Sequence, residues 1–181
     1  MKGFGASLAV VAVLMSGVVF AEPSAVPAGA AVIDEAKVMN ELKASIPPTA
    51  MKSVDDLYQR HQEILAGKSK AVIIDIRREA EFDTGHLKNS NNIEAEMVYT
   101  VPKKITDPST EIWVVCRTKH RATYFTAMLY KYGYKNVYLV DGGIAAWSEK
   151  GYSLVNKYLG EIKVAKYQDR YAEEFQYREN K

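Results

Sequence analysis

The stretch Ile112-Trp-Val-Val-Cys-Arg-Thr-Lys-His-Arg121 decides how this chain is read. Its first four residues are apolar and mostly β-branched, which is typical of a short strand buried on both faces. Cys116, the single cysteine of the chain, follows directly. A polar loop comes next, and a helical pattern then runs from about Arg121 to Tyr132, where Gly133 ends it. The sequence therefore predicts a strand, a thiol and a helix start in immediate succession.

The rest of the chain repeats this alternation of buried strands and helices. Apolar runs at 71–76 and 137–140 predict two further strands, and Asn89 to Ile93 predicts a loop leading into a minor one. Helices are expected over 33–46, from an N-cap at Ser53 to about Ala66, over 79–83 before Gly85, over 94–101 before Pro102, and after Asp141-Gly-Gly to about Lys150. The predicted fold class is α/β, with a parallel sheet covered by helices on both faces.

The two ends of the chain have a different character. Lys2 and the apolar run 8–20, followed by Val19-Phe20-Ala21, predict a signal peptide over residues 1–21. The alternative is an uncleaved N-terminal anchor, the one case in which a membrane contact is expected. Residues 22–50 are then an N-terminal extension with a possible helix, 51–155 the main domain, and 156–181 a tail. We expect a bacterial periplasmic or secreted protein.

The tail carries apolar residues at helical spacing, and the pattern predicts an amphipathic helix. Packing on the domain and binding to a partner both remain open for it. The four residues are Val164, Tyr167, Tyr171 and Phe175.

The net charge and the numbers of cysteines and histidines limit the classes of function that fit this chain. The net charge of +2 over 181 residues is too small to indicate a nucleic-acid partner. An exported chain with one cysteine cannot form an internal disulfide, so Cys116 is either a reactive thiol or a small buried hydrophobe. The three histidines are scattered, so no metal-ligand cluster is expected.

The loop after Cys116 favours the reactive thiol. In an open α/β sheet, ligands bind at the carboxyl ends of the strands, where this loop begins. Backbone N–H groups and the helix dipole supply positive potential there. Arg117, Lys119 and Arg121 add charge, and His120 can add more. Such surroundings are expected to lower the cysteine pKa from about 8.5 to about 7.5 or below. They leave the reaction open, because phosphoryl transfer and sulfur transfer both use a cationic loop of this kind.

Three stretches together resemble a rhodanese-homology domain over roughly residues 51–155. They are Ile74-Asp-Ile-Arg77 with Glu81-Phe82, Gly85-His-Leu87 and Asn92-Ile93; then Cys116 to Ala122; then Val137 to Gly143 with Trp147 and Gly151-Tyr152. The resemblance implies a central parallel sheet of about five strands. It also implies sulfur transfer without metal or organic cofactor, from a small anionic donor such as thiosulfate to a nucleophilic acceptor, for instance a protein thiol.

The resemblance assigns roles by position. It implies that Cys116 is the nucleophile that carries the sulfur as a persulfide, and that Arg121 closes its loop. Residues Arg117, Thr118, Lys119 and His120 make up the rest of the loop. Asp75 and Arg77 would border and brace the site. His86 would be a structural hydrogen-bonding residue, Gly142 and Gly143 would allow a turn, and Trp147 would lie in the core.

The length of the Cys116 loop and its differences from the usual rhodanese loop refine the sulfur-transfer hypothesis. Cys-x4-Arg is one residue shorter than the related phosphatase loop, which favours a single sulfur atom over a phosphate. Lys119 replaces the usual glycine, at a cost of roughly 1 kcal/mol or more if its backbone is left-handed, and adds a cation at the pocket mouth. The alternative from another class is a non-catalytic module that binds a partner or senses anions or redox state. A hydrolase is disfavoured because no Gly-x-Ser-x-Gly elbow is present.

Overall fold

A parallel sheet of five strands forms the centre of the protein, which a computed structural model describes over residues 34–164. The strand order is β1-β5-β4-β2-β3. All four neighbouring pairs are parallel, which confirms the predicted fold class. The strands are β1 (Met51–Lys52), β2 (Val72–Asp75), β3 (Asn91–Asn92), β4 (Ile112–Val115) and β5 (Val137–Val140).

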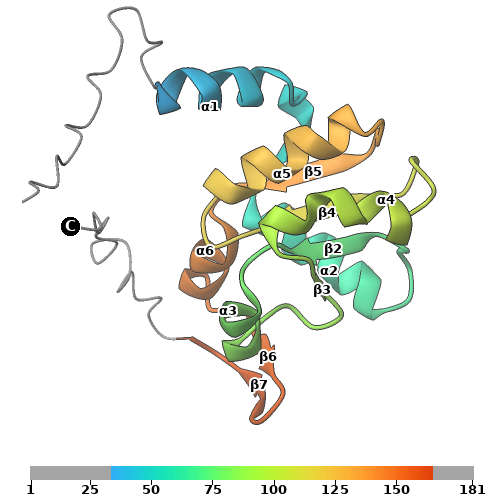
Figure 1. Ribbon diagram of the computed structural model, residues 1–181. Coiled ribbons are helices and arrows are strands. Elements are labelled where there is room, and N and C mark those ends of the chain that lie inside the picture. The colour runs from blue at the N-terminus through green and yellow to red at the C-terminus, as the bar shows by residue number, and fades with distance from the viewer. Residues whose placement is uncertain (1–33, 165–181) are drawn as a thin grey trace, which may run out of the picture. The chain divides into compact units, whose positions relative to one another are not determined.

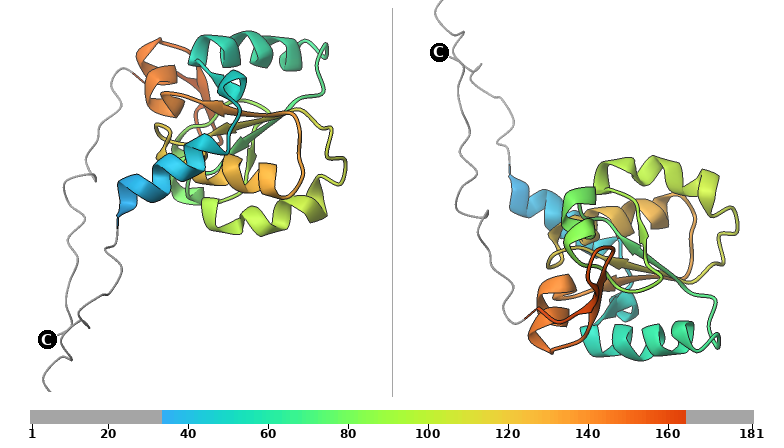
Figure 2. Two further views of the ribbon diagram at one scale, coloured as in Figure 1. Left: turned by 90° about the horizontal axis from the view of Figure 1, so that it is seen from above. Right: turned by 90° about the horizontal axis from the view of Figure 1, so that it is seen from below.

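Helices cover both faces of this sheet, as Figures 1 and 2 show. One face carries the 3₁₀ helix η2 (Ala95–Thr100), α4 (Val101–Lys104) and α5 (His120–Lys131), with α1 (Glu35–Ala44) packed on α5. The other face carries α2 (Val54–Leu65) and α6 (Gly143–Glu149). The short helices η1 (Pro48–Ala50) and α3 (Glu79–Thr84) complete the set.

Strand β4 shows why the sequence forms this layered core. Successive side chains of a strand point to opposite faces, so an uninterrupted apolar run is stable only when both faces are covered. Ile112 and Val114 pack with α5, whereas Trp113 and Val115 pack with α2 and α6. All four are buried, which places the end of β4 in the middle of the protein.

The predicted helix boundaries follow from local signals. Ser53 caps α2 by accepting from the Asp56 N–H at 3.1 Å, and the Asp56 carboxylate accepts from the Ser53 N–H at 2.8 Å. Gly67 follows the end of α2 with a φ of +69°, which glycine adopts without steric cost. The helix expected to stop before Pro102 instead continues as α4, because proline at the first turn of a helix replaces an N–H that needs no partner.

The predicted C-terminal helix is wrong over its first part. A hairpin of β6 (Leu154–Asn156) and β7 (Gly160–Ile162) occupies the start of the expected tail. Gly160 makes the tight turn with a φ of +72°, and the Asn156 side chain accepts from the N–H groups of Tyr158 and Leu159. Leu154 is buried in the core, so this segment packs as a strand.

Several predictions fall on residues that the structure does not describe. They are the signal peptide over 1–21, residues 22–33 of the extension, and tail positions Tyr167, Tyr171 and Phe175. Within residues 34–164, no helix is both long and apolar enough to cross a membrane.

Candidate active site around Cys116

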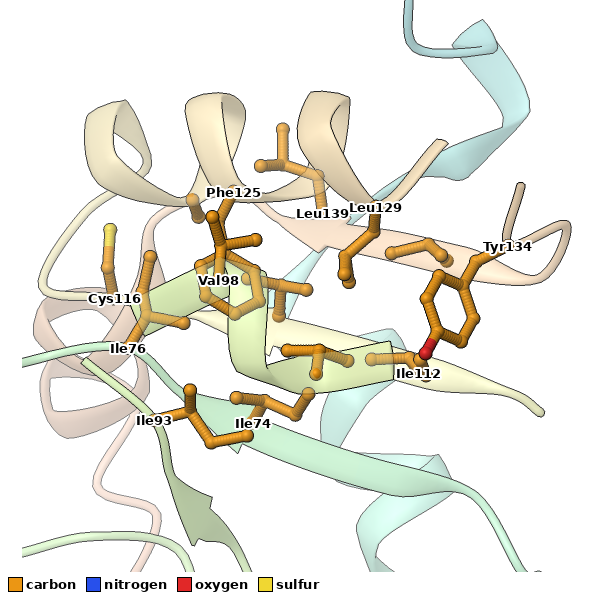
Figure 3. Close-up of a cluster of buried hydrophobic side chains, with 14 residues drawn as sticks. Ile74, Ile76, Ile93, Val98, Ile112, Cys116, Phe125, Leu129, Tyr134 and Leu139 are labelled. Atoms are coloured by element: carbon orange, nitrogen blue, oxygen red, sulfur yellow. The ribbon is translucent and has the colours of Figure 1, made fainter. Parts of the chain in front are cut away.

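Cys116 lies at the carboxyl end of β4, with α5 beginning four residues later at His120. Its side chain is only 1% exposed, and its thiol is free. Figure 3 shows Cys116 at the edge of a hydrophobic cluster, next to Ile76. The predicted order of strand, thiol and helix start is therefore confirmed, and the thiol is more deeply buried than a cationic loop suggested.

The first residues of α6 hold the backbone of the Cys116 loop through hydrogen bonds. The Ile144 N–H donates to the Cys116 carbonyl at 2.9 Å, and the Ala145 N–H donates to the Arg117 carbonyl at 3.0 Å. A Cβ placed on Gly143 would lie less than 3.0 Å from the Cys116 carbonyl oxygen, so only glycine fits there. The sequence indicated that Asp141-Gly-Gly makes a turn, and it missed that the second glycine lets α6 approach the loop backbone.

The pKa of Cys116 differs from the prediction. Burial raises this pKa above its ordinary value, and the negative charge of Asp75 adds to the rise. The backbone N–H groups of Ala122 and Thr118, together with the charge of Arg121, act in the opposite direction and favour the thiolate, but they do not outweigh burial. The expected lowering of the pKa is therefore wrong, because burial acts in the opposite direction and dominates.

Arg121 is held by a carboxylate from a distant part of the chain. Its two terminal nitrogens donate to the two oxygens of Glu81 at 2.8 and 3.0 Å. Partial burial would raise the pKa of Glu81, but the hydrogen bonds and charge of Arg121 outweigh it and hold this pKa below its usual range. Glu81 is thus a site residue to which the sequence assigned no role, although Glu81-Phe82 belongs to the family pattern.

Lys119 is also paired. Its Nζ donates to Asp141 Oδ2 at 3.1 Å, and Asp141 is the residue that precedes the Gly142-Gly143 turn. The backbone of Lys119 has a φ of −159° and a ψ of −21°, well outside the left-handed region. Lysine is accordingly tolerated there without the strain that a left-handed position would have imposed.

Asp75 and Arg77 form a buried ion pair beside the loop, with side chains 0% and 1% exposed. Arg77 Nη2 donates to Asp75 Oδ2 at 2.6 Å and to the Gly85 carbonyl at 2.8 Å. The Asp75 carbonyl accepts from the Ile93 N–H at 3.1 Å, which ties the end of β2 to β3. This geometry matches a bracing role for both residues.

The other predicted residues lie on the loop in different environments. Arg117 is half-buried, whereas Thr118 and His120 are exposed. His86 stacks on Phe82 with ring centroids 3.7 Å apart, and its Nδ1 lies 2.9 Å from the Phe82 carbonyl oxygen, in accord with the structural role inferred for it. Within the described part of the chain, no group of three or more His, Cys, Asp or Glu residues is arranged to hold a metal ion.

Several known proteins that resemble this chain are named as sulfurtransferases. Among curated proteins, the sequence is 30% identical over 105 residues to "Adenylyltransferase and sulfurtransferase UBA4" of Candida albicans, covering 54% of this chain and 24% of that protein. The match therefore spans about a quarter of that relative's length.

Among solved structures, the chain is similar to the "Polysulfide-sulfur Transferase Homodimer" of Wolinella succinogenes, with a TM-score of 0.53 and 25% identity over 67% of this chain and 86% of that one. It also shares the fold of a thiosulfate sulfurtransferase from Pseudomonas aeruginosa, with a TM-score of 0.54 and 24% identity over 70% of this chain and 23% of that one. A family profile described as "Rhodanese-like domain" matches residues 55–150. The chain belongs to the rhodanese-like domain family, a sulfurtransferase-type family.

Proposed function

We propose that this protein is a sulfurtransferase that carries a sulfane sulfur on Cys116. The observation that carries the proposal is the setting of Sγ at the start of α5, where the N–H groups of Thr118 and Ala122 and the charge of Arg121 all favour an anionic sulfur. Preorganised donors of this kind stabilise charge that develops during a reaction. An inert core cysteine has no need of them.

The proposed cycle consists of two displacements that balance without an oxidant or reductant. The Cys116 thiolate attacks the outer sulfur of thiosulfate, the S–S bond of the donor breaks, and its electron pair leaves on sulfite. Cys116 now bears a persulfide anion. A nucleophilic acceptor, such as cyanide or a protein thiolate, then attacks the outer sulfur and the Cys116 thiolate departs as the leaving group.

A second donor has a specific observation in its favour. The Wolinella relative, which matches over 86% of its length, is described as a polysulfide-sulfur transferase. A polysulfide would deliver its terminal sulfur to Cys116 by the same displacement, with a shortened polysulfide as the leaving group. Thiosulfate and polysulfide therefore differ in the leaving anion and not in the role of the protein.

The test is steady-state transfer to cyanide from each donor, followed as thiocyanate formation, with sulfite release measured in the thiosulfate arm. The wild type should turn over with at least one donor, and Cys116→Ser should be inactive with both. The rate should rise with pH, because burial raises the pKa of Cys116 and the thiolate is the nucleophile. Equal product formation by the two proteins would contradict the proposal and favour a module that only binds.

We also propose export to the periplasm or the cell exterior through cleavage after Ala21, which the sequence of residues 1–21 supports. Expression of the full chain with a C-terminal tag, fractionation and N-terminal sequencing test this. A mature protein beginning at Glu22 is expected, whereas a cytoplasmic protein with an intact N-terminus would contradict it.

A further inference from the structure

Three ion pairs lie on the elements that flank Cys116, and they differ in exposure. The Asp75–Arg77 pair is buried, with side chains at most 1% exposed. The Glu81–Arg121 pair is intermediate, with side chains 33% and 37% exposed. The Lys119–Asp141 pair is the most open, at 39% and 46%. Water and dissolved anions therefore reach Lys119 and Arg121 to a similar degree, whereas Arg77 is shielded from both.

The pairs also differ in how firmly the cation is held. Arg121 makes two hydrogen bonds to one carboxylate, a geometry that fixes a guanidinium in place. Lys119 reaches Asp141 with a single hydrogen bond, through a flexible four-carbon side chain. Exposed pairs of this kind prefer the closed state by at most about five-fold in population. Breaking the Lys119–Asp141 ion pair therefore costs little free energy.

Both members of this pair are anchored next to the cysteine. Lys119 comes three residues after Cys116, and Asp141 comes two residues before Gly143, whose α-carbon lies against the Cys116 carbonyl. Lys119 also occupies the N-cap position of α5, and the N–H group of Ala122 in the first turn of this helix acts on Sγ. Lys119 and Asp141 therefore lie at the same edge of the sheet as Cys116.

Arg121 and Lys119 act on different sulfur species, namely the Cys116 thiolate and the incoming donor. Arg121 acts on the thiolate of Cys116 itself, as the direction of its effect on that pKa shows. The Lys119 ammonium is neutralised by Asp141 until another anion replaces the carboxylate. A donor with two negative charges competes with a carboxylate better than one with a single charge, and a neutral donor does not compete at all.

We propose that Lys119 and Asp141 form an entrance pair that selects the sulfur donor of Cys116 by charge. An incoming anion displaces the Asp141 carboxylate from the Lys119 ammonium, so the pair favours small dianionic donors over neutral organic ones. Asp141 is then a specificity-determining residue, because its carboxylate sets how much charge a donor needs. This inference rests on the proposed function.

A pair of alkylating agents tests the entrance pair independently of sulfur transfer. Iodoacetate is anionic and iodoacetamide is neutral, and both react with the same thiolate. The ratio of their rate constants cancels the fraction of thiolate and reports only the selection by charge. At low ionic strength, Asp141→Asn should raise the iodoacetate-to-iodoacetamide ratio about three- to five-fold, and Lys119→Met should lower it by a similar factor. At about 1 M salt both effects should largely disappear.

The chain offers a matched control. Lys150 Nζ donates to Asp55 Oδ2 at 2.9 Å in a pair of similar exposure, away from the Cys116 loop. Lys150→Met and Asp55→Asn should leave the alkylation ratio unchanged. An unchanged ratio in the Lys119 and Asp141 variants, or an equal shift in the control variants, overturns the inference.

The Michaelis constant for thiosulfate provides a second measurement if Cys116 excludes both alkylating agents. Asp141→Asn should lower this constant about three- to five-fold at low ionic strength, and Lys119→Met should raise it. Constants that do not move overturn the entrance pair while Cys116-dependent turnover still supports the proposed function. A shifted alkylation ratio without Cys116-dependent sulfite release keeps the pair and removes thiosulfate as the donor.

Discussion

The buried groups that support the Cys116 loop and the partly exposed ion pairs next to it differ in burial. The floor, defined here as the Asp75–Arg77 pair and the Gly143 contact with the loop, is buried and has no spare room. The rim, defined as the Glu81–Arg121 and Lys119–Asp141 pairs, is a third or more exposed. The floor therefore holds the loop in one shape, whereas the rim sets the charge that a ligand meets.

The difference teaches which changes should affect folding and which should affect chemistry. A buried ion pair that loses one partner leaves an uncompensated charge, which costs about 3–5 kcal/mol. An exposed ion pair contributes about 0–1 kcal/mol, because water screens it and competes for both groups. Variants of the floor should consequently lose stability first, and variants of the rim should change reactivity first.

The largest expected effect is on the floor. Asp75→Asn removes the buried carboxylate charge that pairs with the Arg77 guanidinium and should lower the free energy of unfolding by about 3–5 kcal/mol. Urea denaturation followed by circular dichroism measures this. A loss below about 1 kcal/mol, the value for exposed pairs, would break the distinction between floor and rim.

The second effect separates crowding from backbone strain. Gly143→Ala places a methyl group against three loop carbonyls, whereas Gly151→Ala adds the same group where no atom lies within 4 Å. Both positions have positive φ, so alanine at either one should lose about 1–2 kcal/mol of unfolding free energy through its left-handed backbone. Gly143→Ala should lose about another 1–3 kcal/mol of unfolding free energy from overpacking, as judged by thermal unfolding. Equal losses in the two variants would mean that the loop yields easily.

The third effect concerns the rim and the thiol. Because burial raises the pKa of Cys116, its reaction rate with iodoacetamide should still be rising at about pH 8.5, the ordinary pKa of a thiol. Arg121→Met removes a charge that favours the thiolate, so the pKa of Cys116 should rise further in this variant. The rate at pH 7 should therefore fall in this variant, because a smaller fraction of the thiol is ionised. A wild-type rate that levels off near neutral pH would contradict this assignment.

The smallest effect is on the stability of the rim. Asp141→Asn should change the free energy of unfolding by less than about 1 kcal/mol, and by less again at high salt. Parallel urea titrations at low and high ionic strength measure it. A loss comparable to that of Asp75→Asn would show that Lys119 and Asp141 belong to the floor.

Local signals in the sequence predicted the fold class and several of its elements. Short β-branched runs predicted β2, β4 and β5, and the Ser53 cap predicted the start of α2. Such features depend on neighbouring residues along the chain. The resemblance further placed Asp75 and Arg77 beside the loop, where the structure has them.

The charge state of the site could not be predicted in the same way. Arg121 is paired with a residue 40 positions away and Lys119 with one 22 positions away. A sequence shows three cations after Cys116 but not the carboxylates that the fold brings to them. The depth of Cys116, and thus the direction of its pKa, likewise arises from packing between distant elements.

The most direct test of the central claim is the intact mass of the protein after incubation with thiosulfate or polysulfide. The account predicts that the wild type gains the mass of one sulfur atom, that cyanide or a thiol removes it, and that Cys116→Ser never gains it. A wild type that stays unmodified with both donors, or a Cys116→Ser variant that gains the same mass, would contradict a persulfide on Cys116.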